Sequence, residues 1–66
     1  MDIKRELFNK LNSFHHDKDF VVGVMSNAKH DEDREAILRF MEKDDDVTVE
    51  SIILLSLHLS NERKAK

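Results

Sequence analysis

The sequence predicts an all-α fold, a small bundle of about four short helices forming a single domain over residues 1–66. Several observations indicate this. One glycine and no proline leave few residues suited to tight hairpin turns. Apolar side chains recur at helical spacing between short polar breaks. The most apolar stretch, residues 47–59, is longer than an ordinary strand and rich in leucine.

The first helix is expected at residues 2–14. Asp2 suits its N-cap position, because a short carboxylate can accept a hydrogen bond from the free N–H groups of the first turn. Phe8 lies beside the apolar stripe, and we expect it to widen the buried face; the alternative is an exposed aromatic side chain at a contact. The stripe itself consists of Ile3, Leu7, Leu11 and Phe14.

The second helix is expected at residues 17–29, with Asp17 as its cap. A helical stripe is formed by Phe20, Val21, Val24, Met25 and Ala28, yet Phe20, Val22 and Val24 also alternate as in a strand. A strand needs a neighbour, and the only other segment that could pair with it, the leucine-rich one at residues 47–59, is already assigned to a helix. Helix is therefore favoured, and a strand paired with its copy in a second chain remains the alternative.

The third helix is expected at residues 31–43, where acidic residues occupy the first turn and complement the positive helix amino end. Its buried side consists of Ile37, Leu38, Phe40 and Met41. The acidic run at residues 44–46 is interpreted as a solvated connection, since the glycine and the distal glutamate of an EF-hand calcium loop are missing.

The fourth helix is expected at residues 48–60. Thr48 suits the N-cap, but Ser51 stands where a capping box usually has Glu or Gln. Ser60 and Asn61 are suited to ending a helix, so residues 61–66 are predicted to form a frayed basic tail. Ser56, inside the apolar arc, is expected to bond back to the carbonyl groups of its own helix.

The apolar residues of this helix span about 260° of its circumference, far more than one buried face requires. Such a helix must be central in the bundle or lie at a dimer interface. Leu54 lies at the far edge of the arc and is the residue most expected at a contact with another chain. The candidate interface residues are Ile52, Leu54, Leu55 and Leu59.

The predicted core is a selection of residues from the apolar stripes of all the helices. It comprises Ile3, Leu7, Leu11, Phe14, Phe20, Val24, Met25, Ile37, Phe40, Met41, Ile52, Ile53, Leu55, Leu57 and Leu59. A core in a chain this short gives only a marginal free energy of unfolding unless something reinforces it. The chain has no cysteine for a disulfide, so oligomerisation is the reinforcement that remains.

Composition also bears on location. The absence of cysteine fits a reducing cytoplasm. The longest unbroken apolar run, residues 52–55, is far too short to cross a membrane, and the sequence contains no pattern typical of a signal peptide. We therefore expect a cytoplasmic protein that does not interact with membranes.

The leading functional hypothesis is a small interaction or regulatory protein that binds itself as a homodimer, or binds another protein, through a helix face. The alternative is a helix-turn-helix-like nucleic-acid-binding protein, but the net charge of −3 and the aliphatic fourth helix argue against it. In composition the chain resembles many small acidic helical proteins of bacteria and phages, a similarity that supplies no functional residues.

No enzymatic activity is predicted, and no catalytic, cofactor-binding or metal-binding residues are assigned. So short a helical chain has little interior from which to form an active-site pocket. His15 and His16, with Asp17 and Asp19 nearby, suggest a metal site, but adjacent histidines do not share a helix face. A solvated loop is the favoured interpretation of this segment.

Overall fold

The computed structural model describes residues 2–43 and 46–64, and within these residues the fold is a bundle of α-helices without strands. The helices are α1 (Ile3–Phe14), α2 (Lys18–Asn27), α3 (Asp31–Lys43) and α4 (Val49–Lys64). The predicted all-α class and the order of four short helices are confirmed. The segment that alternates like a strand, residues 20–25, is helical.

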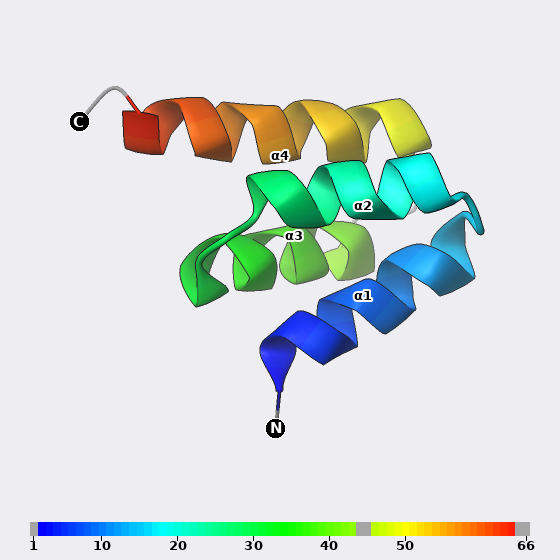
Figure 1. Cartoon of the computed structure of the whole chain (residues 1–66). Coiled ribbons are helices and arrows are strands. Elements are labelled where there is room, and N and C mark those ends of the chain that lie inside the picture. The colour runs from blue at the N-terminus through cyan, green and yellow to red at the C-terminus, as the bar shows by residue number, and fades with distance from the viewer. Residues whose placement is uncertain (1, 44–45, 65–66) are drawn as a thin grey trace.

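The helices form two stacked pairs (Figure 1). α1 packs on α3 and α2 packs on α4, while α1 also contacts α2 and α3 also contacts α4. α1 and α4 lie on opposite sides of the molecule, with α2 and α3 between them. α4 is therefore not central: one of its faces packs on the bundle and the other does not.

Short polar side chains define the helix starts. Asp2 and Asp17 accept hydrogen bonds from the N–H groups of Lys4 and Asp19, as expected for N-caps. The cap of α4 is more complete than predicted. The N–H of Ser51 donates to Oγ1 of Thr48 at 3.1 Å, and the N–H of Thr48 donates to Oγ of Ser51 at 2.9 Å. Serine thus completes the reciprocal capping box in place of Glu or Gln.

The predicted end of the last helix is wrong. α4 continues through Asn61 to Lys64, so the part of the predicted frayed tail that the structure describes is helical. Two side-chain contacts accompany this extra turn. His58 lies 3.3 Å from Glu62 along the helix, and Arg63 binds Asp33 of α3. Residues 65 and 66 of the predicted tail, like Asp44 and Asp45 of the acidic connection, lie outside the described residues.

The core largely follows the prediction, with several corrections. Of the predicted residues, Phe14 and Leu57 are each 42% exposed and do not belong to the core. Phe8 is 43% exposed, so it does not widen the buried face as expected. Val21, Ala28 and Leu38, which lie on the predicted helical stripes but not in the predicted core, are also buried. Asp33 is buried as well and was not predicted. The buried predicted residues are Leu7, Leu11, Phe20, Val24, Ile37 and Ile52, and Ile3, Met25, Phe40, Met41, Ile53, Leu55 and Leu59 are partly buried around them.

Candidate interaction surface

The inner face of α4 is fixed to α2 by a buried polar contact. Ser56, fully buried, donates its hydroxyl to the carbonyl of Ile53 at 2.8 Å, as the sequence predicted. The same oxygen accepts a hydrogen bond from the side-chain amide of Asn27 in α2, at 3.2 Å. Because the hydroxyl has both a donor and an acceptor partner, it can lie in the core without an unsatisfied group.

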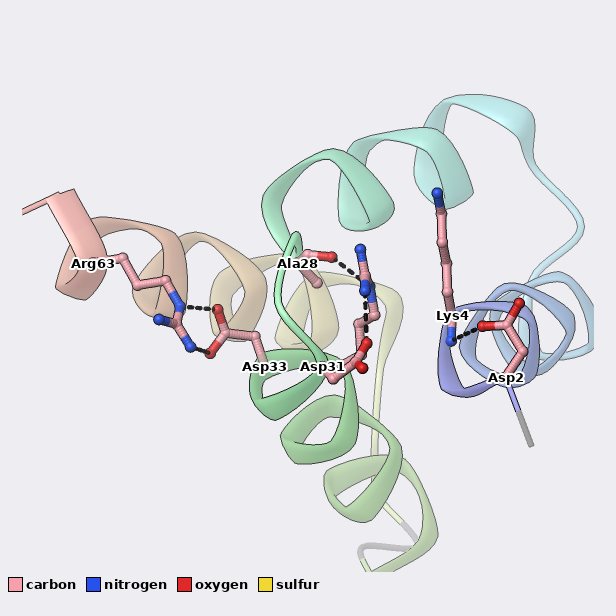
Figure 2. A network of polar contacts seen from close by, with 7 residues as sticks. Asp2, Lys4, Ala28, Asp31, Asp33 and Arg63 are labelled. Atoms are coloured by element: carbon pink, nitrogen blue, oxygen red, sulfur yellow. Dashed lines mark hydrogen bonds and ion pairs between the residues drawn. The ribbon is translucent and has the colours of Figure 1, made fainter.

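A second polar contact fixes the far end of α4 to α3 (Figure 2). Asp33 is buried, and its carboxylate receives two hydrogen bonds from Arg63: Nε to Oδ2 at 2.6 Å and Nη2 to Oδ1 at 3.2 Å. Glu32 lies 3.5 Å from the same guanidinium. The hydrogen bond with Asp33 is the main cause that raises the pKa of Arg63 above its already high ordinary value. The pair is a fixed feature of the fold at neutral pH.

Another arginine fixes the connection between α2 and α3. Arg34 donates from Nε to the carbonyl of Ala28 at 3.0 Å and from Nη1 to Asp31 at 2.8 Å. Figure 2 labels Ala28 and Asp31, which accept these two hydrogen bonds. The short turn between the helices is thus bound to the start of α3, which in turn positions Asp33 to face α4.

These contacts determine which residues of α4 point outward. Ile52 is fully buried, and Leu54 lies two residues later, a rotation of about 200° around the helix. Leu54 is accordingly 60% exposed. The exposed side of α4 carries five residues at alternating spacings of four and three, which we call the outer stripe: Glu50, Leu54, Leu57, Asn61 and Lys64.

The predicted interface residues therefore lie on different sides of α4. Leu54 is 60% exposed on the outer stripe, and its assignment to an interface stays a prediction. Ile52 is enclosed by its own subunit and cannot reach a second chain, so its assignment to an interface is wrong. Leu55 and Leu59 are partly buried against the core. Leu57, predicted as core, belongs to the outer stripe instead. The signal that could have identified it is the four–three spacing, which extends to Glu50 and Lys64.

The ends of the outer stripe carry opposite charges. Within the part of the chain that the structure describes, neither Glu50 nor Lys64 forms an ion pair. Their charges are therefore free to interact with a partner. The stripe has an apolar middle of two leucines, with a carboxylate toward the amino end of α4 and an ammonium group toward its carboxyl end.

The adjacent residues His15 and His16 lie in the connection between α1 and α2. His15 lies 3.6 Å from Asp17, with its ring edge against Phe20, while Nδ1 of His16 lies 3.0 Å from Oδ1 of Asn12. The two rings thus have different neighbours. Among residues 2–43 and 46–64, no group of three or more His, Cys, Asp or Glu side chains is arranged to hold a metal ion.

The side chains of α3 and α4 bear on the helix-turn-helix alternative. The first turn of α3 carries Asp31, Glu32 and Asp33, and the outer stripe of α4 presents leucines where a recognition helix needs polar side chains that read bases. A membrane-spanning helix is not found either: none of the described helices is long and apolar enough to cross a bilayer.

The chain was compared with family models, curated proteins and solved structures. No family model matches the chain, and neither the curated proteins nor the solved structures give a match.

Proposed function

We propose that this protein acts through self-association, with the outer stripe of α4 packing against the same stripe of a second copy. The observation that carries the proposal is the exposure of Leu54 and Leu57 at the centre of a four–three repeat on a long helix. This spacing is the one with which two helices interlock their side chains. Covering both leucines removes apolar surface from water, which favours association.

The charges at the ends of the outer stripe favour an antiparallel arrangement. In a two-fold dimer with antiparallel α4 helices, Leu54 of each copy meets Leu57 of the other, and each Glu50 lies near the partner's Asn61 and Lys64. A parallel arrangement would place Glu50 near Glu50 and Lys64 near Lys64, and like charges repel. The antiparallel dimer gives two attractive charge pairs instead.

The dimer is expected to be weak. Two leucines from each copy, with flanking polar groups, form a contact at the small end of the range for specific interfaces. We expect a dissociation constant on the order of 10–100 µM. Sedimentation equilibrium over a concentration series spanning that range should give a mass rising from the 7.8 kDa of the single chain toward twice that value. A constant mass of one chain throughout would refute the proposal.

Charge reversal tests the arrangement. Glu50→Lys or Lys64→Glu alone should weaken self-association roughly tenfold, because each turns two attractive pairs into repulsive ones. An equimolar mixture of the two variants should associate again, since every charge pair between unlike copies is then attractive. The measurement is sedimentation equilibrium of each variant and of the mixture.

A control separates this effect from a change in overall charge. Lys4→Glu changes the charge as Lys64→Glu does, at an exposed position on α1, on the opposite side of the molecule from α4, and should leave the dissociation constant unchanged. If the single variants associate as well as the unaltered chain, the antiparallel arrangement is wrong.

A further inference from the structure

A second surface lies between α1 and α2 and shares no residue with the outer stripe. The two helices diverge from their connection (Figure 1). An open groove of about 630 Å³ lies between the first half of α1 and the second half of α2. Phe8, Val22 and Met25 supply its apolar lining, and Lys4 and Arg5 line its wide end. A smaller hollow of about 220 Å³ shares Phe8 and Val22 and continues to Lys18.

The apolar lining of this groove is exposed to an unusual degree. Phe8 is 43% and Val22 is 51% exposed, and they lie next to each other across the gap between two helices. An open apolar strip between two helices is the kind of surface on which the apolar face of a third helix can pack.

The charge along the groove is opposite to that of the whole protein. The chain has a net charge of −3, whereas the charged residues lining the two hollows are the cations Lys4, Arg5 and Lys18 and the single anion Asp2. Within the described residues, none of the three cations forms an ion pair. Figure 2 shows Lys4 extending from α1 toward α2.

We propose that the groove between α1 and α2 binds an amphipathic helix of another protein, with an apolar stripe flanked by acidic residues. The apolar stripe would cover Phe8, Val22 and Met25, and acidic residues beside it would meet Lys4 and Arg5 at one end and Lys18 at the other. A second copy of this chain fits less well, because the outer stripe of α4 carries Lys64 along with Glu50. The proposal is independent of self-association through α4.

Two synthetic peptides test this binding. Each is a helix of about five turns with leucine at positions i, i+3, i+4 and i+7; one has glutamate beside the leucines, the other lysine. Fluorescence anisotropy should show the glutamate peptide binding at least tenfold more tightly, because only its charges complement the groove. Amide chemical shifts of the labelled protein should change around Phe8, Val22 and Met25.

Variants locate the binding surface. Val22→Glu should weaken binding of the glutamate peptide roughly tenfold or more, because it places a carboxylate in the apolar lining. Lys4→Glu combined with Arg5→Glu should weaken the glutamate peptide and strengthen the lysine peptide. The control pair, Lys29→Glu with Lys43→Glu, makes the same change in net charge outside the groove and should alter neither. Leu54→Glu, on the outer stripe, should also leave peptide binding unchanged.

Several results would overturn the proposal. One is that the glutamate peptide does not bind at about 1 mM peptide, or that the two peptides bind equally well. Another is that the amide chemical shifts change mainly in α4. A third is that the control pair weakens peptide binding as much as the groove variants do. Vesicles of anionic phospholipid that produce the same shift changes more strongly than the peptide would assign the groove to a membrane surface instead. Circular dichroism of every variant distinguishes lost binding from lost folding.

Discussion

The pair formed by Asp33 and Arg63 has no counterpart in the sequence-based prediction. The two residues are thirty positions apart, and the prediction placed Arg63 in the frayed basic tail at residues 61–66. A carboxylate that is only 8% exposed needs a partner, because its charge has lost most of its contact with water. The partner was unpredictable because it depends on α3 and α4 lying side by side, which local sequence patterns do not encode.

Removing Arg63 should destabilise the fold more than removing an exposed arginine. Arg63→Ala leaves the buried carboxylate of Asp33 without its two hydrogen bonds, whereas Arg63→Lys retains one positive donor and should lose less. Urea unfolding followed by circular dichroism measures the free energy of unfolding for each. Because the pKa of Arg63 is raised, its stabilising effect should persist throughout neutral and mildly alkaline pH and be lost only as the pH rises through that high pKa.

The control for this prediction is Arg39→Ala. Arg39 also forms a short ion pair, with Glu35 at 2.6 Å, but both side chains are mostly exposed. Its removal should change the free energy of unfolding by less than about 0.5 kcal/mol. Equal losses for Arg39→Ala and Arg63→Ala would mean that the buried position of Asp33 has no energetic importance.

At the scale of the helices, sequence reasoning located the starts better than the ends. Asp2, Asp17 and Thr48 are short polar residues whose capping geometry is local, and each caps its helix as predicted. The end of α4 was missed because Ser60 and Asn61 only permit a helix to stop. In the structure the helix continues past them to contacts along α4 and with α3, and no local signal predicts the contact with α3.

α2 is a helix despite a composition that weakens it. Gly23 lies in its interior, and glycine there is less favourable than alanine because it loses more backbone freedom on folding. The backbone at Gly23 does not require glycine, because the φ angle of this residue is not positive. An added Cβ would meet no heavy atom within 4 Å.

Gly23→Ala should therefore stabilise the protein by about 0.5–1 kcal/mol. For a domain of this size the corresponding rise in Tm is about 2–8 °C, measurable by thermal unfolding followed by circular dichroism. Gly23→Val is a matched variant, because the space is open but a β-branched side chain is less favourable in a helix; it should stabilise less than alanine. A lower Tm for Gly23→Ala would show that the glycine has a role that the open space around it does not reveal.

At the scale of the whole molecule, the sequence predicted a surplus of apolar surface but not its location. The apolar arc of α4 is so wide that sequence alone defines no single inward direction. Its rotation is set instead by the contacts of Ser56 with Asn27 and of Arg63 with Asp33. That rotation buries Ile52, which was predicted both as core and as an interface residue, and exposes Leu57, which was predicted as core.

The exposed apolar side chains are consequently distributed over several helices. Phe8 and Phe14 lie on α1, Val22 on α2, and Leu54 and Leu57 on α4. Phe14 lies beside Met41, next to the contact between Lys10 and Glu42. The remaining residues form the groove between α1 and α2 and the outer stripe of α4. Because the two apolar surfaces are separate, the proposed self-association and the proposed peptide binding can occur at the same time. A substitution in the groove is therefore the control for self-association, and a substitution in the outer stripe is the control for peptide binding.

Leu54→Glu should weaken self-association at least tenfold while changing the free energy of unfolding by no more than about 0.5 kcal/mol. The side chain is 60% exposed in the single subunit, so a carboxylate there remains hydrated, whereas in the proposed dimer it would face the partner's Leu57 and lose its water. Val22→Glu is the matched control, with a similarly exposed aliphatic residue on a different surface, and should leave the dissociation constant unchanged. Sedimentation equilibrium and urea unfolding of both variants give the two quantities separately. Equal association of Leu54→Glu and the unaltered chain would place the dimer contact, if one forms, away from the outer stripe.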